Sequence, residues 1–122
     1  MRIRIVLGAI VLLAALPAAA GERLAIWVSP AMSFAPANLV VRAAIEADKD
    51  NRAVEVIAES GEFYRSSEIS LEGKNAPRIN IFEFRSLPSG VYEVRGVLKG
   101  NGDQTRAVTR QQVRVIASGT GS

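Results

Sequence analysis

The sequence predicts an all-β domain in which seven short antiparallel strands form a single two-sheet sandwich. Apolar and polar residues alternate with a period of two along much of the chain, as half-buried strands require. Turn-forming residues recur about every ten positions, and helical periodicity is absent after the N-terminal apolar run. The 122 residues are enough for one hydrophobic core, so a second domain is not expected.

The N-terminal segment has the parts of a secretory signal peptide. Arg2 and Arg4 precede an apolar run, and three small residues suit cleavage after Ala20. Pro17 interrupts this run, which is shorter than the about 20 residues of a membrane-spanning helix. We therefore expect a secreted or periplasmic chain with no stable membrane span after cleavage. The expected divisions are a signal peptide over residues 1–20, the sandwich over 21–117 and a flexible tail over 118–122.

The first three strands are the most regular. Residues 24–28 are apolar and stop at a Ser-Pro pair, and two prolines make residues 30–36 irregular, as at a sheet edge. Residues 39–46 place four apolar side chains on one face, and a polar turn follows at 48–52. Residues 54–59 alternate again, so they form the third strand.

Three further strands follow from weaker alternation and stronger turns. Residues 63–71 are polar at alternate positions, which predicts an exposed strand. Residues 91–99 and 104–116 flank Gly-Asn-Gly-Asp at 100–103, which is the clearest hairpin signal in the chain. We expect these two strands to pair.

The strand over residues 78–84 has an inconsistent pattern. Ile79 and Ile81 share one parity, whereas Phe82 and Phe84 share the other. Either both faces of this strand are covered, or a β-bulge changes its register. The sequence leaves both interpretations open.

Residues 84–94 resemble the corner between strands E and F of immunoglobulin-like and fibronectin type III sandwiches. The segment reads Phe-Arg-Ser-Leu-Pro-Ser-Gly-Val-Tyr-Glu-Val, with a Leu, a Pro and Gly turn, and Tyr-x-Val. The resemblance implies a bacterial immunoglobulin-like fold in which Tyr92 packs inward and its hydroxyl binds the corner backbone, beside Leu87. The sequence departs from the antibody pattern because it has no Cys pair and its only Trp is Trp27, in the first strand.

The residue types present exclude several kinds of chemistry. With no His and no Cys, the chain has no disulfide, thiol nucleophile, His general base, zinc finger or haem attachment site. The formal charge is +3, but two of these charges lie in the signal peptide, so a nucleic-acid partner is not expected. We expect no enzymatic activity, no catalytic residues and no cofactor.

Three acidic residues in predicted turns are weak candidates for a calcium site. Asp48 and Asp50 lie two positions apart, and Asp103 lies in a turn that a sandwich brings near them. The glycine of an EF-hand loop is missing, and the turn preferences of Asp account for all three residues. We therefore expect no metal.

A mixed basic and apolar face is the predicted contact surface. It combines outward residues of three strands, and it suits an envelope protein or a surface polymer. The expected function is an exported, non-enzymatic binding module that docks through this face or an edge strand. The alternatives are a structural accessory subunit of an envelope assembly, or a Ca²⁺- or carbohydrate-binding module. Cross-strand ion pairs with neighbouring glutamates would instead neutralise the face. The residues of this predicted contact surface are Ile57, Arg95, Val97, Val108, Arg110 and Arg114.

Overall fold

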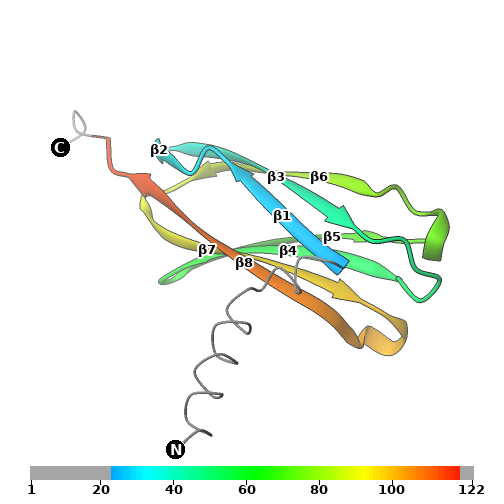
Figure 1. Ribbon diagram of the computed structural model, residues 1–122. Helices are drawn as coiled ribbons and strands as arrows, with labels where there is room; N and C mark the ends of the chain where they lie inside the picture. Colours follow the sequence, from blue (N-terminus) through cyan, green and yellow to red (C-terminus); the bar gives the residue numbers. More distant parts are fainter. Residues whose placement is uncertain (1–22, 119–122) are drawn as a thin grey trace, which may run out of the picture.

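The computed structural model describes residues 23–118 and confirms an all-β fold of two sheets (Figure 1). This part of the chain has eight strands and two short 3₁₀ turns. The predicted signal peptide and all but the first residue of the predicted tail lie outside the described residues. The elements are β1 (Leu24–Ser29), β2 (Met32–Phe34), β3 (Ala37–Ile45), β4 (Ala53–Ser60), β5 (Phe63–Ser70), η1 (Gly73–Asn75), β6 (Ile79–Leu87), β7 (Gly90–Lys99), η2 (Asn101–Asp103) and β8 (Thr105–Ile116).

The predicted count of seven strands is wrong because β2 forms within the stretch that was expected to be irregular. Five residues lie between Pro30 and Pro36, and the middle three of them form this strand. Met32 to Phe34 align in parallel with Arg114 to Ile116 of β8. The partner lies about eighty positions away, so local alternation gives no signal for this pairing.

The strands form a three-stranded sheet of order β1-β3-β6 and a five-stranded sheet of order β2-β8-β7-β4-β5. All pairs are antiparallel except β2 with β8. The predicted pairing of the last two strands is confirmed as the β7–β8 hairpin. Figure 1 shows the two sheets stacked as layers. Assignment of this order to the immunoglobulin topology remains a prediction.

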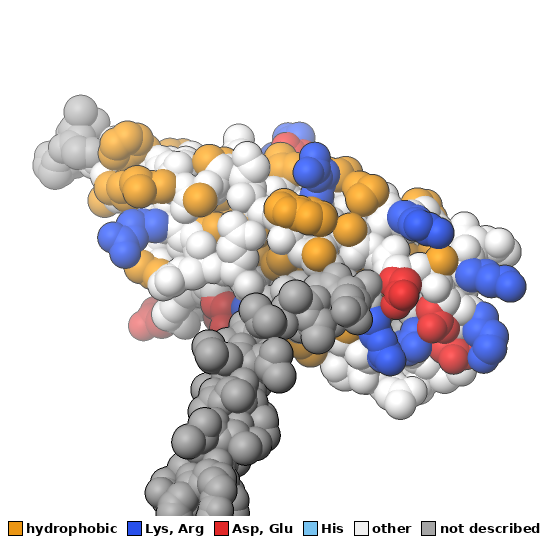
Figure 2. All heavy atoms as spheres, viewed as in Figure 1, with side chains coloured by type: hydrophobic (Ala, Val, Ile, Leu, Met, Phe, Trp, Pro, Cys, Tyr) orange, Lys and Arg blue, Asp and Glu red, His pale blue; other side chains and the backbone are white. Residues whose placement is uncertain are grey.

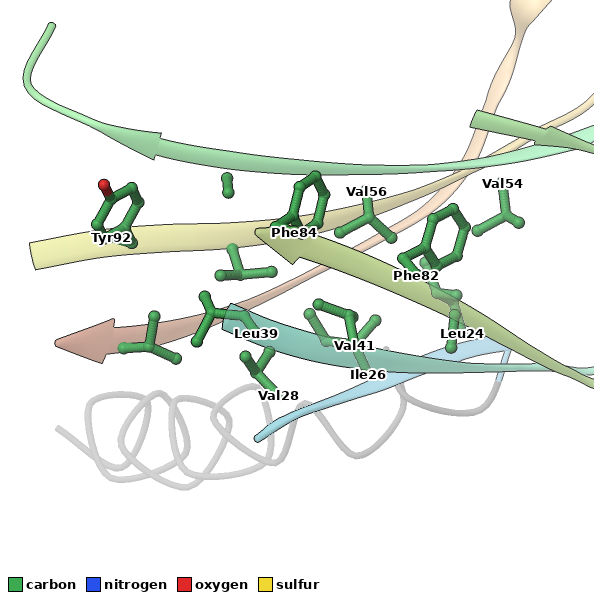
Figure 3. Close-up of a cluster of buried hydrophobic side chains, with 14 of the residues drawn as sticks. Leu24, Ile26, Val28, Leu39, Val41, Val54, Val56, Phe82, Phe84 and Tyr92 are labelled. Atoms are coloured by element: carbon green, nitrogen blue, oxygen red, sulfur yellow. The ribbon is translucent and has the colours of Figure 1, made fainter. Parts of the chain in front are cut away.

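The core lies between the two sheets and consists of alternate residues from both inner faces (Figure 3). Phe82 and Phe84 of β6 point into it, whereas Ile79 and Ile81 are 50% and 53% exposed. The register between β3 and β6 is continuous through these four residues. Neither interpretation of the parity change was therefore correct: β6 is regular there, and its two isoleucines lie on the outer surface.

Tyr92 stands at the corner between β6 and β7. Its ring is fully buried and packs edge-on against Phe63, with 5.9 Å between the ring centroids. Its Oη donates a hydrogen bond of 2.7 Å to the carbonyl oxygen of Pro88, while Leu87 is also fully buried. Gly90 begins β7 with φ of +156°, and a Cβ there would collide with the Ser60 hydroxyl.

The two sheets approach each other where β1 lies beside β8. The backbone N–H of Val28 donates to Oε1 of Gln111 at 3.3 Å, which ties the edge of the small sheet to the large one. Gly96 of β7 lies against β1, and a Cβ at this position would be 2.9 Å from Cγ2 of Ile26. A glycine is therefore needed for this close approach.

Candidate functional site

The predicted contact face on β4, β7 and β8 is largely neutralised by ion pairs within the chain. Arg95 lies 2.6 Å from Glu93 and 3.8 Å from Glu59, and Arg110 lies 3.4 Å from the same Glu93. Of its apolar members, Ile57 is only 7% exposed, while Val97 and Val108 are half-buried. The pairs of Arg95 with Glu59 and of Arg110 with Glu93 join neighbouring strands, as in the alternative that the sequence left open, whereas Arg95 and Glu93 both lie on β7.

Lys99 extends this charge network to the edge of the sheet. Its Nζ lies 3.0 Å from Glu55 and 3.2 Å from Glu68. Hydrogen bonds to these two carboxylates raise the pKa of Lys99 above its ordinary value. Arg114 differs because it is exposed, forms no ion pair within residues 23–118 and aligns with Met32 and Val91 at the other end of the face.

Two of the three candidate calcium ligands, Asp48 and Asp50, have contacts within the chain. Asp48 accepts the backbone N–H of Asp50 at 2.8 Å and the Arg106 guanidinium at 3.2 Å. The backbone hydrogen bond first, and Arg106 second, hold the pKa of Asp48 below its ordinary value. Asp50 pairs with Lys49 at 3.3 Å. Between residues 23 and 118, no three carboxylates including Asp103 come together as a group able to hold a metal.

The outer surface of the three-stranded sheet carries several exposed apolar side chains, and we call it the Trp27 face. Figure 2 shows apolar side chains recurring across the surface over β1 and β3. Four large apolar residues are exposed there: Trp27 by 50%, Val40 by 38%, Ile79 by 50% and Ile81 by 53%. The outward residues of its three strands include Ala25, Trp27, Val40, Arg42, Ala44, Ile79, Ile81, Glu83 and Arg85.

Strand register places these side chains in rows across the sheet. Trp27, Arg42 and Ile81 form one row, because β3 aligns Arg42 with both of its neighbours. The Arg42 guanidinium lies over the indole ring, 5.6 Å from the ring centroid. No acidic residue of the described chain pairs with Arg42. Trp and Arg are the residue types most enriched in energetically dominant contacts between proteins.

Sequence reasoning did not identify this face, although one signal was present. Residues 24–28 are apolar at every position, so alternation alone does not show which side of β1 is buried. Leu24, Ile26 and Val28 turn out to be inside, which leaves Trp27 outside. The usable signal is in β6, where the two isoleucines and the two phenylalanines occupy opposite sets of alternate positions. This pattern places Ile79 and Ile81 on the same side of the sheet as Arg42.

The described residues include no helix long and apolar enough to cross a membrane. The hollows on the surface of the described residues are open to solvent and are lined by both polar and apolar atoms. One of about 420 Å³ lies between the β3–β4 and β7–β8 loops, where Arg52, Lys99 and Asp103 line it. Its charges are mixed, and Arg52 is already bound to Asn101 at 3.0 Å.

No protein-family profile and no curated protein sequence matches the chain. Solved structures do resemble it. A superoxide reductase (neelaredoxin) from Ignicoccus hospitalis has a TM-score of 0.59 at 16% identity, covering 77% of this chain and 80% of that one. A family 76 glycoside hydrolase from a bovine Bacteroides thetaiotaomicron strain gives 0.54 at 16% identity, covering 75% and 20%. The CARDB domain of a Pyrococcus furiosus protein, in complex with di-metal ions, gives 0.50 at 15% identity, covering 79% and 93%.

These comparisons correct the predicted function. A non-enzymatic immunoglobulin-like docking module was expected, whereas the chain shares its fold with superoxide reductases, which are redox enzymes. At 16–18% identity, this likeness concerns the fold alone. An enzyme that passes an electron to superoxide needs a redox-active group, and protein sites for such metals rely on His and Cys ligands. The sequence has neither residue and the described part has no carboxylate cluster, so its residues do not fit a centre of that kind.

Proposed function

We propose that the chain is an assembly domain with the superoxide reductase fold but without a redox centre of its own, and that the Trp27 face is its contact surface. One observation carries the proposal: four large apolar side chains are exposed together on one sheet. Contiguous exposed apolar surface of this kind marks contact sites on proteins. The proposed surface is on the opposite sheet from the face that the sequence analysis favoured.

The energetic case rests on how much surface remains to be buried. Trp27, Ile79 and Ile81 each retain about half of their exposure. Full burial of a large apolar side chain contributes about 1.5–3 kcal/mol, so each of these residues offers roughly 1 kcal/mol on contact. Arg42 adds a cation that already lies over the indole, which holds both side chains in place before any partner arrives.

The second part of the proposal is that the chain has no redox chemistry of its own, and it rests on the missing His and Cys residues. We expect the purified chain to consume no superoxide above the spontaneous rate, even after incubation with ferrous iron. Superoxide consumption that rises in proportion to protein-bound iron would contradict this part. A third part is that the chain is exported as a mature domain.

Photo-crosslinking in the producing cells tests the contact surface. A benzophenone amino acid replaces Ile81 on β6, an edge strand of the Trp27 face, and Ser66 on exposed β5 serves as the matched control position. We expect a covalent protein adduct from position 81 and none from position 66. A folded chain that gives no adduct at position 81, or equal adducts at both, would contradict the proposal.

A further inference from the structure

We infer that the partner of the Trp27 face is a second copy of this chain, arranged face to face about a two-fold axis. This inference rests on the proposed contact surface and names its occupant. In a two-fold interface the same patch serves both partners, so each contact between two different residues occurs twice. The patch must therefore be complementary to itself in both shape and charge.

The charges on the face satisfy this requirement. β1 has no charged residue, and the outward charges of β3 and β6 are Arg42, Glu83 and Arg85. Glu83 binds Arg85 through Oε1 at 3.1 Å, and its side chain remains 46% exposed. Arg42 forms no ion pair with an acidic residue of its own described chain. Each copy thus presents one guanidinium without an acidic partner and one accessible carboxylate whose own partner is Arg85, and a second copy can pair the two reciprocally.

The separation between these two groups suits a reciprocal pair. β3 aligns Val40 with Glu83 and Arg42 with Ile81, so Glu83 and Arg42 lie in adjacent rows of the same sheet face. Ile81 lies between them on β6. A two-fold arrangement that brings Arg42 onto the partner's Glu83 therefore also brings the isoleucines of the two copies together. The face carries two guanidiniums and one carboxylate, so the Glu83 carboxylate would bridge Arg85 of its own chain and Arg42 of the second copy.

The size of the face indicates weak association. Three strands spaced about 4.8 Å apart, with about six residues each rising 3.3 Å, cover a strip of roughly 14 by 20 Å. Stable complexes bury about 800 Å² on each partner, which is more than this strip provides. We therefore expect a weak equilibrium between monomer and dimer that depends on concentration.

A charge exchange tests the identity of the partner. Sedimentation of the purified full chain measures the dimerisation constant of the wild type, of R42E and of E83R. Each single substitution places like charges against each other, and we expect each to weaken self-association about tenfold or more. An equimolar mixture of R42E and E83R should dimerise again, because both cross-pairs then join opposite charges. R114E, the same substitution on the other sheet, should leave the constant unchanged.

Fluorescence follows the same equilibrium at the interface itself. Trp27 is the only tryptophan, so its emission maximum should shift to shorter wavelength as the wild-type concentration rises. A wild type that stays monomeric, or single variants that dimerise as well as wild type, would overturn the inference. If the chain is monomeric but position 81 still forms an adduct with another protein in cells, the proposed surface stands and only the second copy is rejected.

Discussion

Replacement of Tyr92 by Phe tests the hydrogen bond at the β6–β7 corner. The substitution keeps the buried ring and its edge-on contact with Phe63, and it removes only the hydroxyl that donates to Pro88 over 2.7 Å. A hydrogen bond of this type contributes about 0.5–1.5 kcal/mol net. Pro88 is exposed, so water can bind its carbonyl in the variant, and we expect a loss of about 1 kcal/mol.

Urea unfolding measures this loss, and Y64F is the matched control. Tyr64 is 57% exposed, so removal of its hydroxyl should change the free energy of unfolding by no more than about 0.5 kcal/mol. For a domain of this size, the Tyr92 loss corresponds to a decrease in Tm of about 4–8 °C. Equal stabilities for Y92F and Y64F, or a loss above about 3 kcal/mol for Y92F, would refute this account of the corner.

The same pair of variants gives a test at high pH. Burial raises the pKa of Tyr92 above its ordinary value, against a smaller lowering effect of Arg65. A raised folded-state pKa contributes stability that is present below the unfolded-state pKa and is lost as the pH rises through the folded-state pKa. Wild type should therefore lose more stability above about pH 10 than Y92F does. Parallel losses in both proteins would mean that Tyr92 does not cause this part of the pH dependence.

Three further outcomes are expected. G96A should lower the free energy of unfolding, measured in urea, by about 1–3 kcal/mol, because the added methyl group would lie 2.9 Å from Ile26. An unchanged free energy of unfolding would contradict the close approach of β7 to β1 at this position. I57A should cost about 2–4 kcal/mol in the same assay, because Ile57 is buried, and a neutral effect would return it to the exposed surface. The pKa of Asp48 is lowered in the folded state, so the stabilising effect of this carboxylate is present above the unfolded-state pKa and is lost as the pH falls through the folded-state pKa, below about pH 4. D48N should therefore make the free energy of unfolding, measured in urea, less dependent on acid pH. An acid profile identical to that of wild type would contradict this role of Asp48.

The parts of the fold that depend on neighbouring residues could be predicted from the sequence. The β7–β8 hairpin follows from the Gly-Asn-Gly-Asp turn, because the turn brings its own flanking strands together. β2 could not be predicted in this way. Its three residues pair with a strand about eighty positions later, and no local pattern encodes a partner at that distance.

The candidate site was missed for a related reason. Local alternation predicts that large apolar residues point inward, and it gave conflicting answers for Ile81 and Phe82. The conflict is resolved only by the second sheet, which covers the phenylalanine side of β6 and leaves the isoleucine side open. Conversely, the sequence left open whether Arg95 and Arg110 are free or paired. Glu93 lies two positions before Arg95 on the same face of β7, but only the aligned strands place it beside Arg110 as well.

The contact between β1 and β8 has a consequence for how the domain is made. Val28 binds Gln111, which is 83 residues further along the chain, and β2 also needs β8 as its neighbour. During synthesis, β1 can pair with β3 early, but both N-terminal strands lack their final partner until the last strand leaves the ribosome. Non-local pairing of this kind folds on a time scale of about milliseconds to seconds. Truncation before β8 should therefore leave β2 without its strand partner and Val28 without its hydrogen bond to Gln111.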